Sequence, residues 1–295
     1  MNNVPALFYE AVCLPPLFPS SAISAGRELS GLFSAVANEA YENGVFHCVS
    51  VENGQFYDHN YRKHYGTESV EMVTSENPSW KYHWYTGVSV SADSGKYSID
   101  PAALKHLSAA TKGKRVVLGL ETSNITKELA KWIGSMQWCD YLKISCATLP
   151  TVVGALVRKK TLNDFILQND QISDPEIAVL LELLNQRQFY CAAVVAISQS
   201  TLRRLIAAWN DNPAAMVGKA ICSKQCCKEE RTARDLGFRV CTEEEERHCA
   251  LYYPQFRTFW GLSSTAFILK NQGNEAVYWL SNADRPNSTS VFVFA

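Results

Sequence analysis

Five of the ten cysteines gather in the last third of the chain, where their spacing could serve a metal ion. Thiolates and an imidazole are zinc ligands, and four of them close a tetrahedral site. Structural zinc sites normally use tight cysteine pairs at both ends of the ligand set, and only the first pair here is tight. We therefore expect packing residues and no metal or cofactor, with zinc binding left as the open alternative. The residues concerned are Cys222, Cys226, Cys227, Cys241 and Cys249, with His248 beside the last.

Two histidine arrangements could support catalysis. His47 and Cys48 are adjacent in a predicted strand, so their side chains face opposite sides and cannot form a direct thiolate–imidazole pair. His59 and His64 are five residues apart in a predicted loop, which is not the i, i+4 spacing of a helical metal site. The chain also lacks the common phosphate-binding and hydrolase motifs, such as G-x-x-x-x-G-K-[ST], G-x-S-x-G and H-E-x-x-H. These patterns predict that the protein is not an enzyme.

Composition and charge further narrow the class of protein and the kinds of partner that it could bind. The 295 residues are 47% apolar and 19% charged, which is typical of a globular protein, and the formal net charge is −1. Such a balance favours neither nucleic acid nor an anionic membrane as partner. No apolar run approaches the roughly 20 residues of a membrane span, and residues 1–14 lack the basic start of a signal peptide. Together with the scattered cysteines, this predicts a reducing compartment, the cytosol or nucleus.

One strand–helix unit repeats between residues 88 and 222. Each unit pairs a β-rich run with a helix whose apolar residues recur at i, i+3, i+4 and i+7. A unit that recurs every 20–30 residues is typical of a leucine-rich-repeat-like solenoid or of a parallel α/β sheet. The central residues of the six β-rich runs are Val90, Leu118, Ile144, Leu167, Val195 and Ile221.

Helix starts are marked by capping residues. Asp100-Pro101 and Asp174-Pro175 combine an N-cap acceptor with proline at the first helical position. Ser200 is a candidate cap for a third helix, and Thr242-x-x-Glu245 predicts a capping box for the last one.

The two ends differ from the repeats. Residues 1–44 predict a two-helix module, with the second helix running from about residue 23 to 41. Residues 45–255 form the α/β repeat domain, which opens with a strand ended by Asn53-Gly54. Residues 256–295 contain three β-like runs separated by turn residues, which predicts a small antiparallel β cap.

Both termini resemble nematode F-box-like proteins. The opening Met1-Asn-Asn-Val-Pro-Ala-Leu-Phe-Tyr-Glu-Ala-Val12 is similar to the start of these chains, as are Leu29-Ser-Gly-Leu-Phe33 and Glu39-Ala-Tyr-Glu-Asn-Gly44. The likeness returns in Phe267-Ile-Leu-Lys-Asn271, Ala276-Val-Tyr-Trp279 and Val291-Phe-Val-Phe294. In the middle of the chain, the resemblance lies only in the repeated strand–helix architecture and not in matching residues.

The resemblance implies a substrate adaptor of a cullin ubiquitin ligase. A helical F-box module would bind the Skp-type linker protein, and the repeats would hold an unknown protein substrate. One alternative is an interaction or structural repeat protein without linker binding, because the double proline at 15–16 departs from the F-box pattern. A second alternative is a small-molecule enzyme on a parallel sheet. Residues that the resemblance assigns to linker binding are Val4, Pro5, Phe8, Val12, Leu29 and Leu32.

Overall fold

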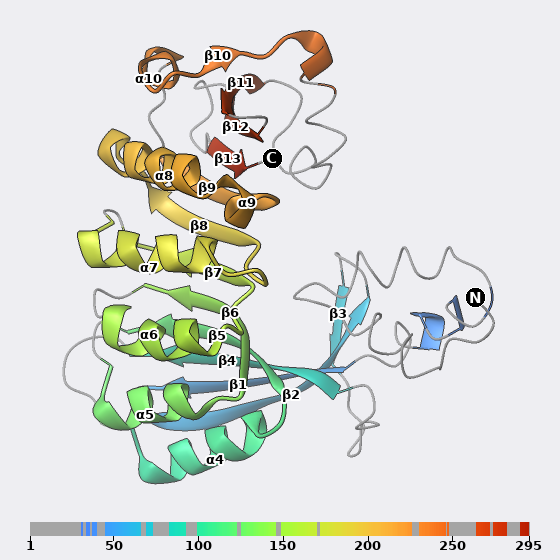
Figure 1. Ribbon diagram of the computed structural model, residues 1–295. Coiled ribbons are helices and arrows are strands. Elements are labelled where there is room, and N and C mark those ends of the chain that lie inside the picture. Colours follow the sequence, from blue (N-terminus) through green and yellow to red (C-terminus); the bar gives the residue numbers. More distant parts are fainter. Residues whose placement is uncertain are drawn as a thin grey trace. The chain divides into compact units, whose positions relative to one another are not determined.

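The computed structural model (Figure 1) divides into two compact units. The first comprises Met1–Thr148 with Thr161–Asn163, and the second comprises Leu149–Lys160 with Asp164–Ala295. The residues that the structure describes are 31, 34–35, 37–39, 45–65, 69–72, 83–92, 99–122, 125–145, 149–169, 172–225, 230–245, 247, 264–271, 274–281 and 290–294.

The first unit is a mixed sheet with strand order β6-β5-β4-β1-β2-β3. Strands β1, β4, β5 and β6 are parallel neighbours, whereas β2 and β3 continue the sheet in antiparallel pairs. Its strands are β1 (Val45–Glu52), β2 (Gln55–Tyr65), β3 (Ser69–Met72), β4 (His83–Ser91), β5 (Arg115–Glu121) and β6 (Trp138–Ile144). Its helices are α4 (Pro101–Thr111) and α5 (Lys127–Ser135).

A two-residue hairpin turn joins β1 to β2. Asn53 and Gly54 both have positive φ, at 49° and 87°, which matches the right-handed twist of the flanking strands. The predicted end of the first strand at this pair is thereby confirmed. The predicted loop around His59 and His64 is wrong, because both residues lie in β2.

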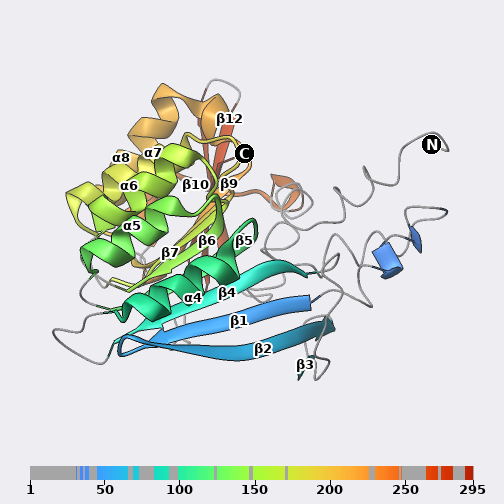
Figure 2. The same cartoon turned by 90° about the horizontal axis from the view of Figure 1, so that it is seen from below.

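Both helices of the first unit cover the same face of its sheet (Figure 2). The Thr86 hydroxyl of β4 donates to the Ala110 carbonyl of α4 at 3.1 Å. The ring of Phe56 in β2 stacks on His106 of α4, with ring centroids 5.1 Å apart. The core under these helices contains the buried alternate residues of the strands, which are Val49, Val51, Val88, Val90, Val116, Leu118 and Leu120.

The second unit also contains parallel strands joined by helices, and it ends in a set of antiparallel strands. Its strand order is β10-β11-β12-β13-β9-β8-β7, in which β7, β8 and β9 are parallel and the remaining pairs are antiparallel. The strands are β7 (Asp164–Leu167), β8 (Cys191–Ala196), β9 (Lys219–Gln225), β10 (Arg239–Val240), β11 (Ser264–Asn271), β12 (Asn274–Ser281) and β13 (Ser290–Phe294). The helices are α6 (Leu149–Lys159), α7 (Asp174–Leu184), α8 (Gln199–Asp211), α9 (Pro213–Met216) and α10 (Glu230–Asp235).

The predicted repeat strands are confirmed. Each of the six central residues lies in its own strand, from Val90 in β4 to Ile221 in β9. Within each unit, parallel strands that follow one another in sequence are also neighbours in the sheet and are joined through a helix. Because such crossovers are almost always right-handed, unbroken sequential order leaves the helices on one face. The C-terminal β-like runs are also strands, and β13 pairs directly with β9.

The N-cap residues of the helices agree with the predicted ones only in part. Asp100 caps α4 by accepting from the Ala102 amide at 2.9 Å, as predicted. The cap of α7 is Ser173, which forms a capping box with Glu176, so Asp174 belongs to the first turn. The cap of α8 is Ser198 and not Ser200. The Ser198 hydroxyl accepts from the Thr201 amide at 3.1 Å, whereas the amide and hydroxyl of Ser173 both donate to the Glu176 carboxylate.

Most of the predicted N-terminal module lies outside the described residues. Helical backbone is present at 34–35 and 37–39, inside the predicted second helix. Among the described residues, no helix has the length and apolar character that crossing a membrane requires.

Trp209 of α8 fills the core of the second unit. Its side chain is fully buried, its ring centroid lies 6.3 Å from that of Phe294, and its indole Nε1 has no hydrogen-bond partner among the described residues. Trp209→Phe keeps the ring contact and removes the buried N–H group. We expect a free energy of unfolding within about 1.5 kcal/mol of wild type in urea denaturation. A larger loss would contradict this expectation and would mean that the cavity left by the smaller ring, or a hydrogen bond of the indole N–H, dominates the effect.

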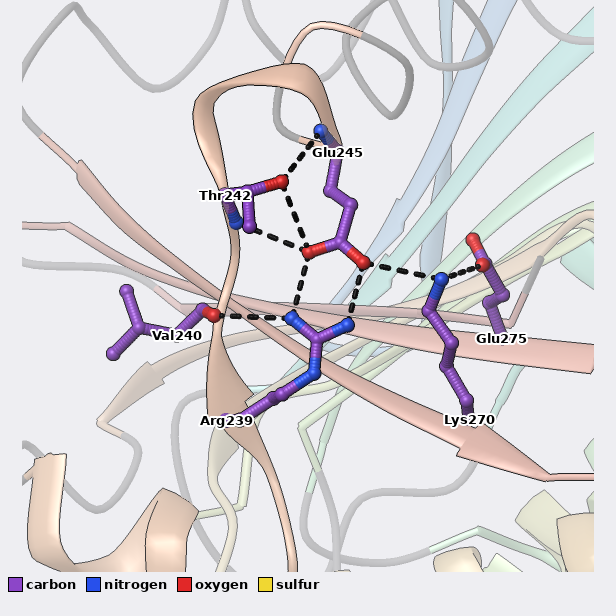
Figure 3. A network of polar contacts seen from close by, with 6 residues as sticks. All are labelled: Arg239, Val240, Thr242, Glu245, Lys270 and Glu275. Atoms are coloured by element: carbon purple, nitrogen blue, oxygen red, sulfur yellow. Dashed lines mark hydrogen bonds and ion pairs between the residues drawn. The ribbon is translucent and has the colours of Figure 1, made fainter.

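A charged network fixes the segment that follows β10 (Figure 3). The Arg239 guanidinium donates to both oxygens of Glu245, at 2.7 and 2.5 Å. Lys270 of β11 lies 3.1 Å from Glu245 and 2.9 Å from Glu275. The predicted capping box is confirmed, because the Thr242 amide donates to Glu245 at 3.0 Å and the Glu245 amide donates to the Thr242 hydroxyl at 3.3 Å.

Glu245 should make stability acid-sensitive. Hydrogen bonds from the Arg239 side chain and then the Thr242 backbone hold the pKa of Glu245 well below its usual range. A carboxylate with a lowered folded-state pKa contributes stability above its unfolded value, and the contribution disappears as pH falls through the folded value. We expect Glu245→Gln to flatten the fall of thermal stability between about pH 5 and pH 2. Glu244→Gln, an exposed neighbour, is the control and should leave the wild-type slope.

Candidate binding surface

The residues that the F-box resemblance assigns to linker binding lie outside the described residues, so this assignment stays a prediction. They are Val4, Pro5, Phe8, Val12, Leu29 and Leu32.

The sheet face of the first unit that is opposite α4 and α5 carries a band of polar side chains, which we call the open strand face. Residues that alternate with the buried core positions point to this side. Strand register aligns them in rows across the sheet, with Glu52, Ser91 and Glu121 in one row and Ser50, Ser89 and Gly119 in the next. Lys143 of β6 pairs with Gly119 and completes the second row. The open strand face is defined by Ser50, Glu52, Tyr57, His59, Ser89, Ser91, Gly119, Glu121 and Lys143.

Its edge on β2 presents an aromatic pair to solvent. The rings of Tyr57 and His59 are stacked with centroids 6.5 Å apart, and Tyr57 is 41% exposed. The Tyr57 hydroxyl donates to the Gln55 side chain at 3.1 Å. Tyrosine combines a large contact area with few rotatable bonds, which is why it is frequent at protein interfaces.

Next to this pair, a buried serine connects a histidine to a carboxylate. The Ser50 hydroxyl lies 2.6 Å from His59 Nε2 and donates to Glu52 Oε1 at 3.0 Å. Because the single hydroxyl hydrogen goes to Glu52, the histidine nitrogen must be the donor to Ser50. A nucleophilic serine needs the opposite arrangement, with the carboxylate on the other ring nitrogen. The cluster therefore orients polar groups on the surface and does not form a Ser–His–acid triad.

Charge on the open strand face is balanced by pairing. Lys143 Nζ lies 2.7 Å from Glu121 Oε1, and both side chains remain partly exposed. An exposed pair of this kind contributes little to stability, so both groups can exchange partners at low cost. On the helix-covered side of the same strands, His47 Nε2 lies 3.0 Å from Asp58, away from the open strand face.

The sequence-based zinc candidates do not come together where the structure describes them. Cys222 lies beside Cys191, whereas Cys241 packs against Ile268 and Val277 in a separate cluster. Cys226, Cys227, His248 and Cys249 lie outside the described residues. In the described part of the chain, no three His, Cys, Asp or Glu side chains are grouped to hold a metal ion.

Sequence reasoning missed the open strand face because it missed β2. The segment 55–65 has polar and aromatic residues in alternation, Gln55-Phe-Tyr-Asp-His59, which is a strand pattern. The pair Asn53-Gly54 before it is the strongest short hairpin signal and would have predicted the returning strand.

Comparison with known proteins gives no relative for this chain: no family model, no curated protein and no solved structure matches it.

Proposed function

We propose that the protein is an F-box-like substrate adaptor of a cullin ubiquitin ligase, which holds a protein target on the open strand face and performs no chemistry itself. The observation that carries the target-binding half is the sheet face opposite α4 and α5, with its exposed Tyr57–His59 pair and its exchangeable charges. The linker-binding half rests on the resemblance of residues 1–44 to F-box proteins.

Sequential strand order within each unit supports a leucine-rich-repeat-like solenoid as the scaffold. Doubly wound sheets place helices on both faces and bind ligands where the strand order reverses. Here the parallel strands β4-β5-β6 and β7-β8-β9 run in order without such a reversal inside either unit. Within each unit, such an arrangement offers a strand surface to a macromolecule.

Linker binding is tested by pull-down of purified full-length protein with the Skp-type linker. Wild type should retain the linker, and Phe8→Asp should abolish retention, because a charge at this apolar contact would be buried without a partner. Tyr57→Ala is the matched control and should retain the linker. If wild type does not bind, the ligase function is wrong, and the open strand face remains a binding surface of another kind of protein.

A further inference from the structure

Two thiols from neighbouring strands meet in the second unit. Cys191 of β8 and Cys222 of β9 have their sulfur atoms 3.9 Å apart. Both are half-buried and pack against Ala220, Val291 and Val293 on the same side of the sheet. The parallel strands and this apolar cluster hold the two side chains in position. The pair is therefore a preorganised set of two sulfur ligands.

Strand register argues against a disulfide between them. Cys191 pairs with Ala220 and Cys222 pairs with Ala193, so the cysteines are offset by two residues along adjacent strands. With strands about 4.8 Å apart and a rise of about 3.3 Å per residue, this offset separates the Cα atoms by about 8 Å. Disulfides span at most about 6.8 Å between Cα atoms. The pair therefore stays a dithiol unless the strands move.

Cys191 is also a poor nucleophile. The hydrogen bond with Cys222, burial, and the negative charges nearby raise the pKa of the Cys191 thiol well above its usual value. Thiolate is the reactive form of cysteine, so the Cys191 thiol is unreactive when nothing is bound. A cation that coordinates both sulfurs displaces their protons.

We propose that Cys191 and Cys222 bind a soft monovalent ion of the Cu(I) class. Thiolates select Cu(I) and zinc over harder ions. Zinc requires four ligands, whereas Cu(I) is satisfied by two thiolates, and the described residues bring only these two to the position. In the binding step two S–H bonds break, two protons go to solvent and two S–Cu bonds form. Copper keeps its oxidation state, so no oxidant or reductant takes part.

Anaerobic titration of the full-length protein with Cu(I) against a chromogenic chelator tests the site. Because the chain has ten cysteines, the informative quantity is the difference between variants. Cys191→Ala and Cys222→Ala should each lose about one tightly bound equivalent relative to wild type, since one thiolate cannot hold the ion alone. Cys241→Ala is the matched control, because it packs in the neighbouring apolar cluster, and it should keep the wild-type stoichiometry.

Equal stoichiometry and affinity in wild type and both variants would overturn the proposal. So would full displacement of this equivalent by equimolar zinc, which would indicate a site with more ligands. If either variant fails to fold, alkylation of wild type followed by mass spectrometry decides the question. At a pH high enough to label both thiols of the metal-free protein, Cu(I) should protect Cys191 and Cys222 together from the alkylating reagent, and unchanged labelling of both would contradict the site.

Discussion

Replacing Lys219 with methionine should lower the free energy of unfolding by about 3–5 kcal/mol. The residue is 3% exposed, and its ammonium group donates to three main-chain carbonyls. One of these carbonyls belongs to Leu184, the last residue of α7, one to Gln186 just after it, and the third to Ala215 in α9. Methionine preserves the length of the side chain but leaves three buried acceptors without this donor. Each such loss costs about 1–3 kcal/mol.

Urea denaturation of the full chain measures this loss. Arg203→Met is the matched control, since Arg203 is an exposed cation on α8 and its replacement should change stability by less than about 0.5 kcal/mol. A Lys219→Met variant within about 1 kcal/mol of wild type would mean that water or a shifted side chain reaches these carbonyls.

Replacing Arg115 with methionine should lower the free energy of unfolding by about 2–3 kcal/mol at neutral pH. The loss is somewhat smaller than for a fully buried ion pair, because Arg115 is 36% exposed. The guanidinium of Arg115 in β5 is hydrogen-bonded to the carboxylate of Asp140 in β6. The Asp140 side chain is only 2% exposed, so water cannot replace the lost partner. The uncompensated carboxylate, and not the lost attraction, dominates the expected cost.

The pH dependence identifies the cause of this loss. Burial raises the pKa of Asp140, and the hydrogen bond and charge of Arg115 limit the rise. Without Arg115 the folded-state pKa should climb further above the unfolded value. A carboxyl group with a raised folded pKa destabilises the fold above that pKa and stops doing so once it is protonated. Arg115→Met should therefore approach wild-type stability near pH 4.

The double variant Arg115→Met/Asp140→Asn separates charge burial from packing. We expect it to recover most of the stability lost at pH 7, because no buried charge remains. A double variant as unstable as Arg115→Met would assign the loss to the packing of the arginine stem instead.

The repeat strands could be predicted because they leave a strong pattern in the sequence. Each carries a central apolar residue, and the helices between them keep one apolar phase, as Leu202, Leu205, Ile206 and Trp209 do in α8. Helix N-caps were predicted less well, because several residues in a short stretch can act as the N-cap. Ser198 and Ser200 are both candidates at the start of α8, and Ser198 is the cap. The hydroxyl that reaches the first-turn amides depends on backbone torsions that composition does not reveal.

The side-chain pairs could not be predicted, because each joins residues far apart in sequence. Cys191 and Cys222 meet 31 residues apart, and Arg115 and Asp140 meet 25 residues apart. Both pairs depend on which strands are neighbours and on their register. A shift of one residue would turn every side chain of a strand to the opposite face. The open strand face differs from these pairs, because the local hairpin signal at Asn53-Gly54 predicts that β2 pairs with β1.

The most direct test of the adaptor function compares two variants of the tagged full-length protein by affinity purification and mass spectrometry. Phe8→Asp should lose the Skp-type linker and keep the target proteins. Tyr57→Ala/His59→Ala should keep the linker and lose the targets, because it removes the aromatic pair of the open strand face. Opposite losses in the two variants are the predicted result. Retention of every partner by both variants would contradict the account.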